Sequence, residues 1–263
     1  MQYNYIEHAE FQPNDNIIET NYSNKIIINT LNTIIPSMGF VWDNTIWSYT
    51  HPIDGIRAYT RMDISPKLNS NGLDFKTISF DIRAYKPVAN GISLASRIYF
   101  GRSFGDNAQN FHLGGIPWLF SSEESIYAND PRTGDNSLEN IFLSEYVMPI
   151  RGSQINEVQG TNTVLINAEI RLPFLVYYFP SIKYLGQING VFFTDIGAAW
   201  SGSKPEYWIG ESWNSSPKDF IWTYGFGPRF ILFGLPVKLD YAWEYNPSYK
   251  TERMWYFSIG LDF

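Results

Sequence analysis

The chain has 263 residues, of which 44% are hydrophobic and 17% aromatic, and this composition fits one folded domain and excludes a disordered chain. Its net charge of −7 and the lack of any Lys/Arg run argue against a nucleic-acid-binding surface, which needs clustered cations. The 20 Gly, 15 Pro and many aromatic and β-branched residues favour an all-β fold, and the absence of Cys excludes disulfides and thiolate metal sites.

The sequence does not decide the secondary structure of the first 36 residues. The segment IIINTLNTII predicts either one more strand or a short helix, and we expect residues 1–36 to be a partial strand or connector. The opening residues MQYNYIEHAEFQPNDN lack a basic region followed by an apolar run, so no secretion signal is visible, and no apolar run is long enough for a transmembrane helix. If the protein is exported, we expect this chain to be part of a longer precursor.

From residue 37 the chain reads as strands with one polar and one apolar face. SMGFVWDNT at residues 37–45 comes first, and the next three segments carry their charges on a single face. That predicted polar face holds Arg57, Tyr59, Arg61 and Asp63, then Ser79, Asp81 and Arg83, then Arg97 and Tyr99. Residues 106–150, rich in Ser, Asn, Asp, Gly and Pro, read as a loop.

The alternation is sharpest in the carboxy-terminal half. In TNTVLINAEIRLPF, an apolar face that runs from Val164 to Phe174 opposes Asn167, Glu169 and Arg171. INGVFFTDIGAAW, FIWTYGFGPRFILF, PVKLDYAWEY and the final WYFSIGLDF repeat the pattern, and residues 201–219 read as a second loop. The sequence thus predicts about nine strands of roughly 9 to 14 residues, mostly in hairpin order.

Periodicity alone does not decide which face meets water. In a soluble sandwich or a lipocalin-like carrier the apolar face points inward, whereas in a transmembrane barrel it meets lipid and the polar face lines the lumen. Large aromatics such as Trp222, Trp243 and Trp255 on the apolar faces, strands long enough to cross a bilayer, and mid-strand charges of both signs favour the membrane. We therefore predict an all-β, antiparallel transmembrane β-barrel, built as a meander of long strands.

A series of short motifs runs along the chain from about Gly39 to Phe263. In order they are FVWDNTIWSYTHPIDGIRAY, FHLGG, PIRGS, NAEIRLPF, VFFTDIGAAW, GFGPRF, PVKLDYAW and WYFSIGLDF. The series resembles the carboxy-terminal barrel of the bacterial surface antigen superfamily, the BamA/TamA-type outer-membrane assembly and translocation barrels. The resemblance implies that residues 37–263, with a long loop at 106–162, are the carboxy-terminal part of a sixteen-stranded barrel in the bacterial outer membrane. Phe263 looks like the terminal strand signal of such barrels.

The resemblance also assigns a role to the polar stretch VMPIRGSQINEVQG. In barrels of this family an Arg-Gly loop folds back into the lumen, and its arginine contacts acidic residues on the next two strands. The matching positions are Arg151 and Gly152 in the loop and Glu169 and Asp195 on the strands, where strand parity independently places both acids inward. A guanidinium suits two carboxylates because it stays charged and presents a planar fork of donors. The chain departs from the family at Ser153, where Phe or Tyr is usual.

No catalytic residue, metal or cofactor is expected. His8, His51 and His112 lie far apart in loop-like contexts without metal-ligand spacing, and we predict that they are surface residues. Glu169 and Asp195 could form a glycosidase pair, and a serine with His112 could serve a phospholipase, but no triad spacing is evident and the acids have a simpler partner in Arg151.

The resemblance implies a function in inserting or secreting proteins at the outer membrane. A weak seam between the first and last strands would open, and a client strand would pair with the exposed edge. The implied partners are outer-membrane lipids, client outer-membrane or secreted proteins, the remaining barrel strands and an amino-terminal domain, without nucleic acid. The alternative is a passive pore, or a barrel that anchors an amino-terminal module.

Overall fold

The computed structural model describes residues 2–10, 26–48, 51–68, 72–89, 91–116, 120–121, 144–147, 149–173, 188–205, 219–246, 251 and 253–260. The regular structure in these ranges consists of strands. No helix in this part of the chain is long and apolar enough to cross a membrane. Phe263 and most of the predicted loop at 201–219 lie outside the described residues.

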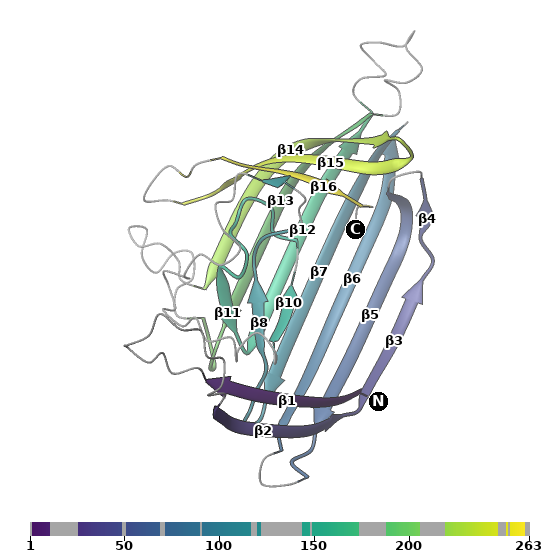
Figure 1. Ribbon diagram of the computed structural model, residues 1–263. Coiled ribbons are helices and arrows are strands. Elements are labelled where there is room, and N and C mark those ends of the chain that lie inside the picture. The colour runs from purple at the N-terminus through teal and green to yellow at the C-terminus, as the bar shows by residue number, and fades with distance from the viewer. Residues whose placement is uncertain are drawn as a thin grey trace, which may run out of the picture.

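One curved, 11-stranded sheet forms the wall of the molecule (Figure 1). Its order is β3-β5-β6-β7-β12-β13-β14-β15-β16-β9, with β4 beside β5, and every neighbouring pair is antiparallel. The strands are β3 (Ser37–Asp43), β4 (Ile46–Trp47), β5 (Pro52–Ser65), β6 (Phe75–Ala89), β7 (Ile92–Phe104), β9 (Phe120–Ser121), β12 (Asn162–Leu172), β13 (Asn189–Trp200), β14 (Phe220–Leu232), β15 (Leu235–Glu244) and β16 (Met254–Ile259). The predicted all-β, antiparallel fold is confirmed, and the sheet departs from hairpin order where β7 pairs with β12 and where β16 pairs with β9.

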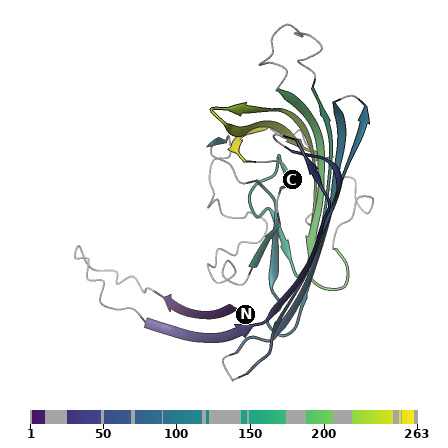
Figure 2. The ribbon, with the colours of Figure 1, turned by 90° about the vertical axis from the view of Figure 1, so that its right-hand side faces the viewer.

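The two faces of the sheet differ as the alternation predicts. In β12, the side chains of Ile166 and Ile170 are 40% and 46% exposed, whereas Asn167, Glu169 and Arg171 are almost fully buried. Because successive side chains of a strand point to opposite faces, the polar residues collect on one side of the sheet. That side is the concave one, and it is covered by other parts of the chain (Figure 2). The apolar side is left open on the convex surface.

A second, small sheet lies against the concave face of the wall (Figure 2). It has the order β10-β8-β11, formed by β8 (Asn110–Leu113), β10 (Ser144–Val147) and β11 (Val158–Gly160), with β10 parallel and β11 antiparallel to β8. We call this sheet, with residues 149–157 before β11, the lumen plug. The prediction that residues 106–150 form only an irregular loop is therefore wrong, because this stretch supplies β8, β9 and β10.

Small residues in the wall make room for the plug. A Cβ atom on Gly101 would lie 2.5 Å from a ring carbon of Phe111, and a Cβ on Gly197 would overlap Ile150 and Leu113. Real Cβ atoms do not approach other atoms so closely, so a larger residue at either position would have to displace side chains of the plug. The buried apolar cluster between wall and plug comprises Tyr99, Phe111, Leu113, Val147, Ile150, Val158, Leu165, Ala199 and Ile221.

The amino-terminal region forms a hairpin apart from the main sheet. Strands β1 (Gln2–Glu10) and β2 (Ile26–Ile35) pair antiparallel with each other. The segment IIINTLNTII is thus a strand, and the helix alternative is wrong. The hairpin projects from the end of the sheet where β3 begins (Figures 1 and 2).

Candidate functional site

The turn that contains Arg151 and Gly152 is held at both ends by hydrogen bonds within the plug. The N–H of Ile150 donates to the carbonyl of Gly115 at 2.9 Å. The buried hydroxyl of Ser153 donates to the Ile150 carbonyl and accepts from the Gly115 N–H, both at 3.0 Å. Gly152 has a φ of 87°, and a Cβ there would lie 2.8 Å from the Cβ of Ala242 in the wall. Only glycine fits this turn without strain.

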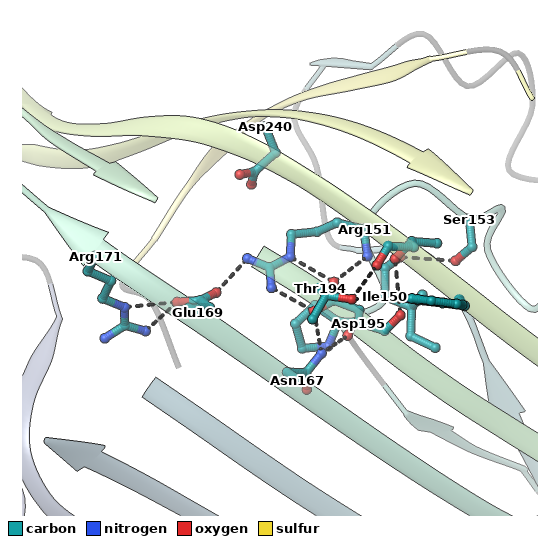
Figure 3. A network of polar contacts seen from close by, with 12 residues as sticks. Ile150, Arg151, Ser153, Asn167, Glu169, Arg171, Thr194, Asp195 and Asp240 are labelled. Atoms are coloured by element: carbon teal, nitrogen blue, oxygen red, sulfur yellow. Dashed lines mark hydrogen bonds and ion pairs between the residues drawn. The ribbon is translucent and has the colours of Figure 1, made fainter. Parts of the chain in front are cut away.

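Arg151 points from this turn into the wall (Figure 3). Its Nε and Nη2 donate to the two oxygens of Asp195 at 2.8 and 2.7 Å, and its backbone N–H donates to the same carboxylate at 3.0 Å. Its Nη1 donates to Oε1 of Glu169 at 2.5 Å. The guanidinium carbon lies 3.7 Å from the ring centroid of Phe193, and Asn167 donates to Asp195 at 2.8 Å. The arginine is 3% exposed, so water does not weaken these contacts.

A second arginine extends the network along the same face of the sheet toward β5. Arg171 lies two residues beyond Glu169 on the same face of β12 and donates to Oε2 of that acid at 2.8 Å. Glu169 therefore lies between two guanidinium groups, one from the plug and one from the wall (Figure 3). The Nη1 of Arg171 also donates to the carbonyl of Pro52, the first residue of β5, at 3.0 Å. We call the residues Arg151, Asn167, Glu169, Arg171 and Asp195 the arginine clamp.

The charges around the clamp balance. Arg229 on β14 donates to Asp240 on β15 at 2.7 Å, and both are buried. Together with the clamp, this pair makes three cations and three anions: Arg151, Arg171 and Arg229 against Glu169, Asp195 and Asp240. Buried charges persist only where each is paired, because the desolvation of an unpaired ion costs several kcal/mol.

The electrostatics of Arg151 favour a permanent ion pair. Burial alone would lower the pKa of Arg151, but the charges of Asp195 and Glu169 outweigh it and hold this pKa well above its ordinary value. The residue thus stays charged at any physiological pH, and its two acids stay neutralised. Within the described ranges, no group of three or more His, Asp or Glu side chains could hold a metal ion. The arrangement is suited to holding the turn in place.

The plug has a further polar contact away from the clamp. The hydroxyl of Tyr99 on β7 donates to Oε1 of Glu145 on β10 at 2.9 Å. This contact and the apolar cluster around Phe111 fix the β8 and β10 side of the plug. The plug is therefore docked on the wall through these polar and apolar contacts as well as through the charges of the clamp.

Comparison with known proteins identifies the family. The model of the Omp85 superfamily domain matches residues 1–263. The chain belongs to the Omp85 superfamily. Among solved structures it is similar to BamA from Haemophilus ducreyi lacking POTRA domains 1–3, with a TM-score of 0.53 and 14% identity. That likeness covers 92% of this chain and 45% of the BamA chain, so this chain spans about half the length of that structure. No curated protein sequence matches the chain.

Omp85 membership confirms the resemblance to the surface antigen superfamily, and the likeness to BamA confirms the fold class, an antiparallel transmembrane β-barrel. Omp85 membership, together with the likeness to BamA, also places the chain in the bacterial outer membrane. The apolar convex face of the wall is accordingly the lipid-facing side of the Omp85 barrel, and the concave face with the plug is the lumen side.

The structure brings four of the predicted site residues of this Omp85 chain together. Arg151 and Gly152 lie in the turn, and Glu169 and Asp195 face them from β12 and β13. The fifth, Phe263, is outside the described residues. The bracing role of the four remains a prediction, since their contacts are observed and their effect on function is not.

Sequence reasoning left several members of the site out. Arg171 shares the inner face with Glu169 by simple parity, so the period-two pattern could have found it. Phe193 stands on the same inner face two residues before Asp195, but an aromatic among inward positions gives no signal of its own. Tyr256 on β16, whose hydroxyl reaches the turn, has no sequence signal because the contact spans more than one hundred residues.

The prediction of three surface histidines is wrong for two of them. His51 and His112 are 6% and 7% exposed. His112 is part of β8 in the plug, and His51 directly precedes Pro52. Both segments read as loops because they are short and polar, yet each folds against the lumen face, where polar residues become buried. His8 lies in β1, and its side chain is outside the described part of the chain.

Proposed function

We propose that this chain is the barrel part of a factor that inserts or translocates proteins at the bacterial outer membrane. Its chemistry would be strand exchange: a client strand displaces β9 from Tyr256 and Phe257 and then pairs with the edge of the last strand, β16, through backbone hydrogen bonds. Family membership supports this function at the level of the superfamily. The proposed partners are outer-membrane lipids, unfolded client outer-membrane or secreted proteins, and the strands that complete the barrel.

The observation that carries the proposal is an interruption of strand pairing next to the last strand, between β14 and β15. Lys76–Ala89 of β6 pairs with Ile92–Phe104 of β7 almost without interruption. The ladder between β14 and β15, in contrast, lacks pairs at Gly227–Pro228, where proline has no N–H to donate. A strand held by fewer backbone hydrogen bonds separates at lower cost, as exchange with a client requires.

The arginine clamp would keep the plug in place while the edge opens. Its acids are on β12 and β13, well inside the sheet, where pairing runs along the whole length of the strands. The plug therefore has an anchor that does not depend on β16. We propose that this arrangement holds the lumen face in shape during exchange.

Covalent catalysis is not part of the proposal. Glu169 and Asp195, which could resemble an acid and a nucleophile, are both buried and neutralised by arginines, so neither is free to donate a proton or attack a substrate. A passive pore has less support, because the plug lies across the concave side that would line the channel (Figure 2).

Reconstitution of the full-length protein into liposomes tests the function. An outer-membrane protein unfolded in urea is added, and its insertion is followed by protection from protease. We expect faster insertion than into empty liposomes. Because the chain has no Cys, a single Ile259→Cys at the edge of β16 should also form a disulfide with a client that carries one Cys in its terminal strand. Equal rates with and without the protein would refute the function, and ion conductance without insertion would favour a pore.

A further inference from the structure

The Arg-Gly turn has a second attachment, which lies on β16 and not among the charges. The ring of Tyr256 is fully buried in a cluster that also contains Ile116, Val191, Phe193 and Ala242. Its hydroxyl accepts a hydrogen bond from the N–H of Gly152 and donates one to the carbonyl of Ser153, each at 3.2 Å. The turn is thus held by its side chain at β12 and β13, and by its backbone at β16.

The two attachments belong to different parts of the sheet. Asp195 and Glu169 lie on neighbouring strands that pair along their full length. Tyr256 lies on β16, three strands beyond β13 in the sheet, and its backbone pairs with Ser121 of β9. Any movement of β16 away from β15 would carry the Tyr256 hydroxyl away from the turn, while the clamp would hold Arg151 where it is.

We propose that Tyr256 is a positioning residue that ties the Arg-Gly turn to the last strand, so that displacement of β16 and release of the turn are coupled. The inference deepens the proposed function, since it makes the plug sensitive to the state of the edge that would accept a client. The hydroxyl is the coupling group, and the ring supplies only packing. Removal of the hydroxyl alone should therefore free the turn from β16 without loss of the fold.

Tyr256→Phe makes this change, and Tyr99→Phe is its matched control. Each variant removes one hydroxyl from the interface between wall and plug, but Tyr99 contacts Glu145 on β10 and does not touch the turn. Spin labels are attached to cysteines at Gln154, which is exposed beside the turn, and at Arg253, which is exposed just before β16. These 263 residues contain no Cys, and any Cys elsewhere in the full-length protein is replaced first, so that the labelling is specific. The distance distribution between the labels is measured on the full-length protein in liposomes.

We expect a narrow distribution in the parent and in Tyr99→Phe. In Tyr256→Phe a second, displaced population should grow about tenfold, as expected from the loss of two neutral hydrogen bonds. An unchanged distribution in Tyr256→Phe would overturn the proposal, and so would equal broadening in both variants, because the hydroxyl would then act only through general docking of the plug. The measurement uses no client protein, so its result is independent of the insertion assay. The coupling can be confirmed when the proposed function is refuted, and it can be refuted when the proposed function is confirmed.

Discussion

Replacement of Arg151 by alanine is the most direct perturbation of the clamp. The variant loses the donors to Asp195 at 2.8 and 2.7 Å and the donor to Glu169 at 2.5 Å. Charge-assisted hydrogen bonds contribute about 1.5–3 kcal/mol each, so a simple sum would suggest roughly 4.5–9 kcal/mol. The sum overstates the cost, because the two acids do not lose all of their partners.

The structure shows which charge the substitution leaves uncompensated. Glu169 keeps its ion pair with Arg171, so its charge remains neutralised. Asp195 keeps the amide of Asn167 and the backbone N–H of the turn, but within the described residues its ion pair is with Arg151, so no cation replaces the lost guanidinium. One broken buried ion pair costs about 3–5 kcal/mol, which is the loss of unfolding free energy that we expect. The companion variant with Asp195→Asn in addition should recover part of that loss, because no charge is then left unpaired.

Urea unfolding in lipid vesicles, followed by tryptophan fluorescence, measures these differences. Arg57→Ala is the matched control, because Arg57 also lies on an inner face but pairs with Asp43 at 3.4 Å, and both side chains are partly exposed. We expect the control to lose less than about 1 kcal/mol. The reasoning on buried charge would be refuted if Arg151→Ala were no more destabilised than Arg57→Ala. It would also be refuted if adding Asp195→Asn to Arg151→Ala lowered the free energy of unfolding by as much as Asp195→Asn does alone.

Three further changes test other contacts of the plug. Gly197→Val should undock the plug and cost about 1–3 kcal/mol, seen as faster proteolysis, whereas Gly39→Val, where a Cβ meets only ordinary contacts, should not. Phe193→Leu removes the ring beneath the clamp arginine and should lower the free energy of unfolding by about 1–2 kcal/mol; in a variant that already lacks the arginine the loss should be smaller, because only the packing of the ring is then lost. Burial raises the pKa of Glu145, so this carboxyl group binds a proton more tightly when the plug is docked than when it is undocked. Docking should therefore weaken as the pH rises from the ordinary carboxyl pKa through the raised value. Glu145→Gln should abolish this pH dependence.

The wall could be predicted from sequence because its physics is local. A strand exposes alternate side chains to opposite faces, so parity alone predicts that Glu169 and Asp195 lie on the inner face, where both are buried. The direction of that face followed from the size of the outward residues and from the family resemblance. Glu169 and Asp195 met Arg151 as the resemblance implied, because their strands are neighbours in the sheet.

The plug could not be predicted in the same way. Its strands are short, and β10 lies parallel to β8 across a long connection, so neither periodicity nor hairpin turns announce the pairing. The burial of His112 and the reach of Tyr256 depend on how the plug packs against the wall. Such contacts join residues far apart in the chain, and no local pattern encodes them.

The central claim is that the apolar face of the wall meets lipid and the charged face meets the plug. Single cysteines along β12, in a chain without native Cys, can carry a fluorophore that is quenched by brominated acyl chains. We predict quenching at Ile166, Ala168 and Ile170 and none at Leu165 or Asn167, a strict alternation along the strand. Uniform quenching, or quenching at the odd positions instead, would contradict the account.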